Sequence, residues 1–316
     1  MIIKTEQDVT AAVLAEISRA DDPRVVEILS ALVRHLHDFA REVRLTEAEF
    51  QAAIGYVVAL GQRTTESHNE AVLTAGSLGL STLICLLNNG RSGQEETTAN
   101  LLGPFWRAGA PFMESGASII RSPTPGQALF ATIRVEDTNG LPVADADVDI
   151  WQASPEGYYE NQDPDQADMN LRGCFKTNAG GEFKFRSVLP TGYPIPVDGP
   201  AGELARTLKR HNMRPAHIHF LIAKEGFKTQ TSQVYLRQDP NLETDVQFGV
   251  TERLIGNFTR HDDGTPAGFD TDGLEGAWYE LHFTFTLEPG ASRLPKPPIA
   301  GKATGERPRL QRLVRE

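Results

Sequence analysis

The segment Arg214-Pro215-Ala216-His217-Ile218-His219 contains the side chains best suited to metal chemistry. On a β-strand alternate side chains share a face, so His217 and His219 would point the same way while Ile218 faces the core. Two neighbouring imidazoles are half of the ligand set of a transition metal, although such pairs also occur on surface strands. A zinc site would need further His, Cys or carboxylate ligands. A cupin-type iron site would need a glutamate and a third histidine at spacings that this chain lacks.

Two tyrosines complete a candidate ligand set. Tyr159 follows Gly157-Tyr158, and Tyr193 lies in Gly192-Tyr193-Pro194-Ile195-Pro196. A phenol loses its proton near pH ~10 in water, but a trivalent cation strongly stabilises the phenolate. Two tyrosinates and a hydroxide would balance the charge of Fe(III), and neutral His217 and His219 would complete the coordination. We therefore predict one ferric ion per subunit.

Together these motifs resemble the intradiol ring-cleavage dioxygenases, and the resemblance covers nearly the whole chain. It implies that the iron ligands are Tyr159, Tyr193, His217 and His219. It also implies that Tyr193 takes up protons from the substrate, that Arg214 stabilises negative charge on the ring, and that Gln233 is a polar neighbour of the iron. The implied reactants are a small aromatic diol or triol and O₂.

The runs 149–152, 193–200 and 248–250 are similar to those of the family members that cleave hydroxyquinol (1,2,4-trihydroxybenzene). We expect 3-hydroxy-cis,cis-muconate, or its tautomer maleylacetate, as the product. Catechol or a substituted catechol, giving a cis,cis-muconate, is the alternative, because Gly76 stands where an acidic residue is expected and Gln247 where a small apolar residue is expected. The resemblance implies that the substrate pocket is lined by Leu73, Gly76, Leu101, Leu102, Gly103, Pro104, Phe105, Ile195, Pro196, Arg214 and Gln247. A non-catalytic β-sandwich that binds a sugar or a protein is a more distant alternative.

Two kinds of element must position these residues. Helical signals fill the first hundred residues: Asp22-Pro23 and Thr46–Glu49 are helix starts, and an apolar run from about Glu66 ends at Asn88-Asn89-Gly90. From near Ser92 to about Thr286 short runs alternate with period two, which is typical of strands. We predict a mainly β fold with α: an antiparallel β-sandwich after a helical domain. The predicted ranges are 1–100 for a helical dimerisation and linker domain, 101–290 for the Fe(III) catalytic sandwich, and 291–316 for a Pro/Arg-rich tail that wraps the body or a partner subunit.

Composition restricts the classes of partner. The net charge of −11 argues against a nucleic-acid binder. No signal-peptide pattern and no apolar stretch of the ~20 residues needed for a membrane span is evident. Cys85 and Cys174 are too few and too far apart for a disulfide framework, so we expect a cytoplasmic protein that is not embedded in a membrane. The resemblance implies a homodimer through the N-terminal helices and a phospholipid at the dimer interface.

Overall fold

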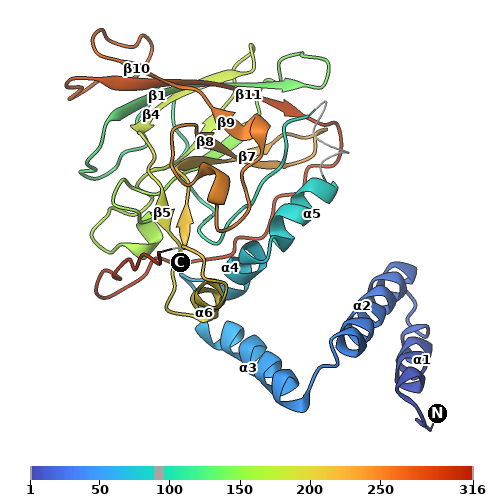
Figure 1. The fold of residues 1–316 in the computed structure, drawn as a ribbon. Helices are drawn as coiled ribbons and strands as arrows, with labels where there is room; N and C mark the ends of the chain where they lie inside the picture. Colours follow the sequence, from blue (N-terminus) through green and yellow to red (C-terminus); the bar gives the residue numbers. More distant parts are fainter. Residues whose placement is uncertain (1, 89–95, 315–316) are drawn as a thin grey trace. The chain divides into compact units, whose positions relative to one another are not determined.

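The computed structural model describes residues 2–88 and 96–314 and divides into two compact units, Met1–Val58 and Ala59–Glu316. The first unit holds α1 (Glu6–Ile17), α2 (Pro23–Glu42) and the start of α3 (Glu47–Arg63), drawn in blue in Figure 1. Asp22 caps α2 by accepting the backbone N–H of Arg24, and Thr46 with Glu49 forms the reciprocal bonds of a capping box at α3. Both predicted helix starts are therefore confirmed.

The predicted third helix is two helices, α4 (Glu70–Ser77) and α5 (Leu80–Asn88), bent by 78°. The first helix ends before Gly79, whose φ of +72° lies in the left-handed region. The chain therefore changes direction within the continuous apolar run. Among the described residues no single helix is long and apolar enough to cross a membrane; only this bent pair passes that test, which buried core helices also pass. Asn89-Gly90, the predicted end of the run, lies outside the described residues.

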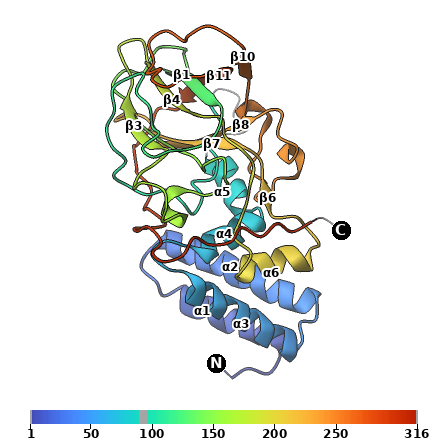
Figure 2. The same cartoon turned by 90° about the vertical axis from the view of Figure 1, so that its left-hand side faces the viewer.

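Two β-sheets form the body of the second unit (Figure 2). One has the order β10 (Phe258–His261), β11 (Trp278–Leu287), β1 (Ala128–Asp137), β4 (Glu182–Val188). The other has the order β3 (Arg172–Lys176), β2 (Asp147–Trp151), β7 (His217–Ala223), β8 (Gln230–Leu236), β9 (Ile255–Gly256). Their strand pairs are antiparallel except β1 with β11 and β8 with β9, which are parallel.

Apolar side chains of both sheets meet in one core, as expected for a sandwich. Ile218 and Phe220 of β7 are fully buried against Phe185 of β4 and Phe285 of β11. Because side chains alternate along β7, His217 and His219 must face the opposite side of this sheet. The sandwich core thus fixes the direction in which the two imidazoles point.

Short elements and loops cover that opposite side. They include β5 (Tyr193–Pro194) paired with β6 (Met213–Arg214), the helix α6 (Pro200–Thr207), and the 3-10 turns η1 (Glu160–Gln162), η2 (Leu242–Thr244) and η3 (Glu252–Leu254). The tail lies against the same unit: the backbone oxygen of Pro308 accepts a hydrogen bond from Tyr158, and Arg307 pairs with Asp163. Of the two predicted arrangements, over the body or over a partner subunit, these contacts agree with the first.

Candidate metal and substrate site

Four donor atoms from separate stretches of the second unit converge on one buried point. The Tyr159 oxygen lies 2.9 Å from the Tyr193 oxygen and 2.9 Å from Nε2 of His219. Nε2 of His217 lies 3.1 Å from Nε2 of His219 and 3.5 Å from the Tyr193 oxygen. Each of the four side chains is at most 3% exposed. The structure thus brings together the four residues predicted as ligands.

The protonation states of these donors suit a cation. Burial, with Arg214 alongside, lowers the pKa of His217 to about 3, so its imidazole is neutral. Its Nδ1 lies 2.6 Å from the carbonyl oxygen of Pro215 and donates to it, which leaves the lone pair on Nε2 facing the other donors. Burial, and then His217, lowers the pKa of His219 well below its ordinary value.

The phenols need a positive charge to ionise. Burial raises the pKa of both Tyr159 and Tyr193, so at neutral pH both are protonated in the protein alone. A trivalent cation between the oxygens would reverse that preference, since its charge is the largest in the site. No group of three or more His, Cys, Asp or Glu suited to a metal occurs among the described residues. Two phenols with two imidazoles fit a hard trivalent metal ion.

Tyr158 and Tyr159 have separate roles. The Tyr158 hydroxyl donates to the backbone oxygen of Pro308 at 2.7 Å, and the Arg307 guanidinium lies 4.2 Å from its ring centre. Gly157, directly before these tyrosines, has a φ of +91°, a conformation that favours glycine. The preference for Tyr159 over Tyr158 as the inward-facing tyrosine agrees with this geometry.

Aromatic rings hold the donor rings in place. Trp151 stacks on His219, with ring centres 4.6 Å apart and planes within 10°. Phe105 stacks on Tyr159, also at 4.6 Å. The buried Arg172 donates to the backbone oxygen of Phe105 at 2.8 Å and pairs with the carboxylate of Glu160, the residue after Tyr159. Ring positions are thus set by packing and by a buried ion pair.

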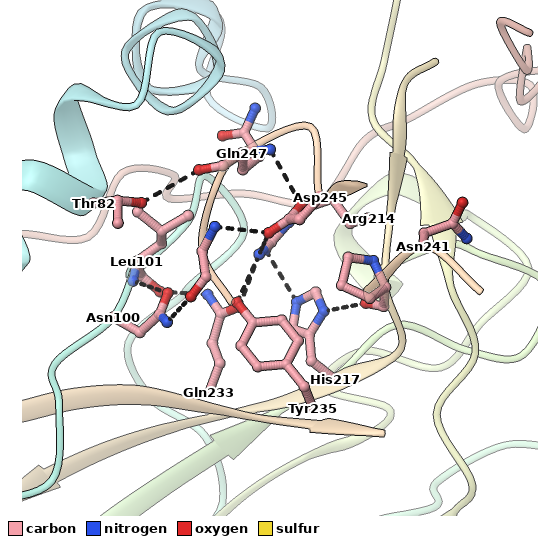
Figure 3. A network of polar contacts seen from close by, with 12 residues as sticks. Thr82, Asn100, Leu101, Arg214, His217, Gln233, Tyr235, Asn241, Asp245 and Gln247 are labelled. Carbon is pink, nitrogen blue, oxygen red and sulfur yellow. Dashed lines mark hydrogen bonds and ion pairs between the residues drawn. The ribbon is translucent and has the colours of Figure 1, made fainter. Parts of the chain in front are cut away.

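Arg214 is the cation of the site (Figure 3). Its Nη1 lies 3.2 Å from Nε2 of His217, and Asp245 holds it through two bonds of 3.1 and 3.0 Å. Burial alone would raise the pKa of Asp245, but Arg214 lowers it on balance, so the carboxylate is ionised. Nη2 of Arg214 also donates to Oε1 of Gln233 and to the Tyr235 hydroxyl, both at 3.0 Å. Gln233 thus contacts Arg214, pairs in register with His219, and donates its Nε2 to the Leu101 oxygen.

Asp245 and Tyr235 belong to the site but were not predicted from the sequence. Asp245 lies 31 residues from Arg214, in a loop with no recognisable motif, and only the fold brings the two together. Tyr235 belongs to β8, where it pairs in register with His217. A tyrosine two residues after Gln233 on the same strand shares its face, and that spacing was the available signal.

A cavity of about 710 Å³ opens next to these residues. Nine of the predicted substrate contacts line it: Leu73, Leu101, Leu102, Gly103, Pro104, Phe105, Ile195, Arg214 and Gln247. Gly76 is not on its wall because the Gln247 side chain covers it. Pro196 instead lines a second cavity of about 480 Å³ beside Arg63, His68 and Arg309. The missed lining residues come from α4, α5 and the tail: Asn69, Val72, Ala75, Leu80, Ser81, Ile84, Cys85, Lys296, Pro297 and Pro298.

Comparison with known proteins gives consistent matches. Residues 101–289 match the family described as "Dioxygenase", and residues 22–96 match "Catechol dioxygenase N terminus". The chain is 40% identical to 6-chlorohydroxyquinol 1,2-dioxygenase of Cupriavidus pinatubonensis over 90% of this chain and 98% of that protein. It is 40% identical to hydroxyquinol 1,2-dioxygenase of a Rhizobium species over 83% of this chain and 88% of that protein.

Solved structures agree in fold. Hydroxyquinol 1,2-dioxygenase of Pseudomonas putida superposes with a TM-score of 0.79 at 33% identity, covering 90% of this chain and 99% of that one. Catechol 1,2-dioxygenase of Pseudomonas arvilla superposes with a TM-score of 0.77 at 30% identity, covering 98% and 99%. The helical N-terminal region and the sandwich therefore occur together in both.

Proposed function

The chain belongs to the intradiol ring-cleavage dioxygenases, and from this premise we propose that it opens the ring of hydroxyquinol with O₂. Both oxygen atoms enter the product, 3-hydroxy-cis,cis-muconate, which tautomerises to maleylacetate. The observation that carries the proposal is the convergence of two phenol oxygens and two imidazole nitrogens within 2.9–3.5 Å beside a cavity that Tyr193 and His219 line. The names of the 40% identical relatives support the choice of a triol.

We propose that one Fe(III) per subunit is held by Tyr159, Tyr193, His217 and His219. A ferric ion held there would withdraw electron density from a bound diol and so make its ring carbon reactive toward O₂. Tyr193, which lines the cavity, accepts a proton from a substrate hydroxyl. Arg214, kept charged and oriented by Asp245, stabilises the negative charge that develops on the ring. The buried rings of Phe105 and Trp151 exclude water from the donors.

Catechol is the second candidate substrate. Catechol 1,2-dioxygenase of Candida albicans is 33% identical over 89% of this chain, and Gly76 with Gln247 departs from the hydroxyquinol pattern. A non-catalytic binding module is not supported, because the chain belongs to an enzyme family along nearly its whole length.

Oxygen uptake by the iron-loaded protein tests the proposal. We expect one O₂ consumed per hydroxyquinol, both atoms of ¹⁸O₂ in the ring-opened diacid, and a kcat/KM at least equal to that for catechol. No uptake with either substrate would overturn the proposed activity. A strong preference for catechol would overturn only the choice of substrate.

We also propose that the chain divides at about residues 100 and 290, as predicted. The helical part, residues 1–100, would form a homodimer with the same part of a second subunit. Ile28, Leu32, Leu36 and Phe39 form one apolar stripe on α2 and are each 49–54% exposed. An exposed stripe of this kind is typical of a surface that another chain covers. Replacing Leu32 and Leu36 with glutamate should yield monomers in analytical ultracentrifugation; an unchanged dimer would contradict the assignment.

Two further proposals concern a bound phospholipid and the cellular location of the protein. A phospholipid bound at the dimer interface would suit the exposed apolar side chains of α2, and mass spectrometry of an organic extract would detect it. A cytoplasmic location suits the absence of a disulfide between Cys85 and Cys174, since disulfides are rare in reducing compartments. Cell fractionation tests the location.

A further inference from the structure

The C-terminal tail, residues 291–314 of the described chain, packs on the segment that contains the candidate ligand Tyr159. The backbone N–H of Ala303 in the tail donates to the backbone oxygen of Asn161 in that segment, the Tyr159 turn (residues 156–163), at 2.7 Å. The tail begins after the end of the match to the dioxygenase family. The family match therefore does not account for these contacts.

Arg307 links the two ends of the Tyr159 turn. Its Nη2 lies 2.8 Å from Oε2 of Glu156 and 2.9 Å from Oδ2 of Asp163, so one nitrogen bridges two carboxylates. The guanidinium also lies 4.2 Å from the centre of the Tyr158 ring. Because Tyr159 lies between Glu156 and Asp163 in the sequence, the two ion pairs close the turn around it.

The ion pair with Asp163 differs from an ordinary surface pair. The Asp163 side chain is 1% exposed, and among the described residues Arg307 is the only cation paired with it. Without Arg307 the carboxylate would keep its hydrogen bonds from the N–H of Asp165 and the amide of Gln166, but it would be buried without a counter-ion. The turn can relieve that cost by moving the carboxylate toward water, and Tyr159 would move with it.

The tail is also attached to the segment that carries the second phenol. The buried Asn212 donates from Nδ2 to the backbone oxygen of Ile195 at 2.7 Å and to that of Gln311 at 2.9 Å. Its Oδ1 accepts the N–H of Leu313 at 2.9 Å. Because Ile195 lies two residues after Tyr193, the tail contacts both segments whose phenol oxygens meet in the site.

We propose that Arg307 is a positioning residue for the metal site, which closes the Tyr159 turn and so holds the phenol oxygen among the other three donors. This inference rests on the proposed iron ligands and adds a residue that is not itself a ligand. Replacing a residue that orients a metal ligand typically lowers metal affinity by about 10–100-fold. Arg307 acts through the backbone of the turn, so we expect the lower end of that range.

Arg307→Ala tests the inference. The affinity for ferric iron, measured by competition with EDTA, should fall about ten-fold. The visible tyrosinate-to-iron absorption should shift in wavelength at equal iron content, because the Tyr159 oxygen is no longer held in place. In the metal-free protein, hydrogen–deuterium exchange should rise in the Tyr159 turn and stay unchanged in the sandwich strands.

Arg134→Ala is the matched control. Arg134 also pairs with two carboxylates, those of Glu136 and Glu182, and its side chain is 36% exposed, compared with 30% for Arg307. It belongs to β1, in the sheet that carries none of the four donors. Its replacement should therefore change neither the iron affinity nor the absorption.

Glu156→Gln is a milder second variant. It opens the same bridge at its exposed end and leaves Asp163 paired, so it provides the test if Arg307→Ala does not fold. Loss of an exposed ion pair should lower the iron affinity about three-fold. Melting temperatures of the metal-free proteins show which variants fold.

An iron affinity and absorption in folded Arg307→Ala equal to those of Arg134→Ala would overturn the inference. Unchanged exchange in the Tyr159 turn, or an unchanged iron affinity in Glu156→Gln, would also overturn it. Failure of the proposed ligand set has a different signature: the unmodified protein then binds no iron, and both assignments are wrong.

Discussion

Replacing Asp245 with asparagine should destabilise the protein strongly and impair turnover. Asp245 accepts two hydrogen bonds from Arg214, at 3.1 and 3.0 Å, and two from the backbone N–H groups of Gln247 and Gly249, at 3.1 and 2.8 Å. Asparagine keeps the shape but leaves the guanidinium, which is 3% exposed, as an unpaired buried charge. Removal of one partner of such a pair costs about 3–5 kcal/mol.

The assay is denaturant unfolding of both proteins at pH 7, with kcat/KM measured alongside. A loss of about 3 kcal/mol would be a large part of the 5–15 kcal/mol that typically separates folded from unfolded chains. Activity should fall as well, because Arg214 loses the group that orients it beside His217.

Asp147→Asn provides the control for this change. Asp147 pairs with Lys176 on the same sandwich, but both side chains are 48% exposed, so the loss should be below about 1 kcal/mol. If Asp245→Asn costs no more than Asp147→Asn, the Arg214–Asp245 pair does not have the structural importance assigned to it.

Two other changes have defined outcomes. Tyr159→Phe should lose iron and the visible tyrosinate-to-iron absorption of the loaded protein, whereas Tyr158→Phe should keep both, because its hydroxyl bonds Pro308 instead; equal spectra would contradict the ligand choice. Glu70→Gln should lower stability by about 2 kcal/mol at pH 7, since Glu70 accepts from His68 and from the N–H of Ala201 at the start of α6. Burial raises the pKa of Glu70, but these hydrogen bonds lower the pKa of the folded state below the ordinary value of 4.5. The stabilisation by the carboxylate is therefore complete above pH 4.5 and is lost as the pH falls through the pKa of the folded state. Urea unfolding at pH 7 and pH 4 should show the difference shrinking, and a constant difference would contradict the assignment.

The parts of the fold that local patterns determine could be predicted. Alternation of apolar residues identified the core face of β7, and Ile218 and Phe220 lie there as expected. The parallel pairing of β1 with β11 could not be predicted, because these are the first and last strands of the sandwich and lie far apart in the sequence. The corner between α4 and α5 was missed because apolar residues continue across Gly79.

The candidate site also has residues that could be predicted from the sequence and contacts that could not. Residue type and motif identified Tyr159, Tyr193, His217 and His219. Each has a side chain that can bind a metal, and each lies in a short motif, either a tyrosine after a glycine or the His-x-His pair. The contact of Gly76 with Gln247 had no such signal, because the two residues meet only after α4 packs against the loop that follows η2. Contacts between distant segments determine the cavity wall, and a single sequence does not contain them.

Anomalous X-ray scattering at the iron absorption edge, from crystals of the iron-loaded protein, tests the central claim most directly. We predict one strong peak per subunit at bonding distance, about 2 Å, from the oxygens of Tyr159 and Tyr193 and from Nε2 of His217 and His219. A peak at another position, or a different metal among these four side chains, would contradict the account.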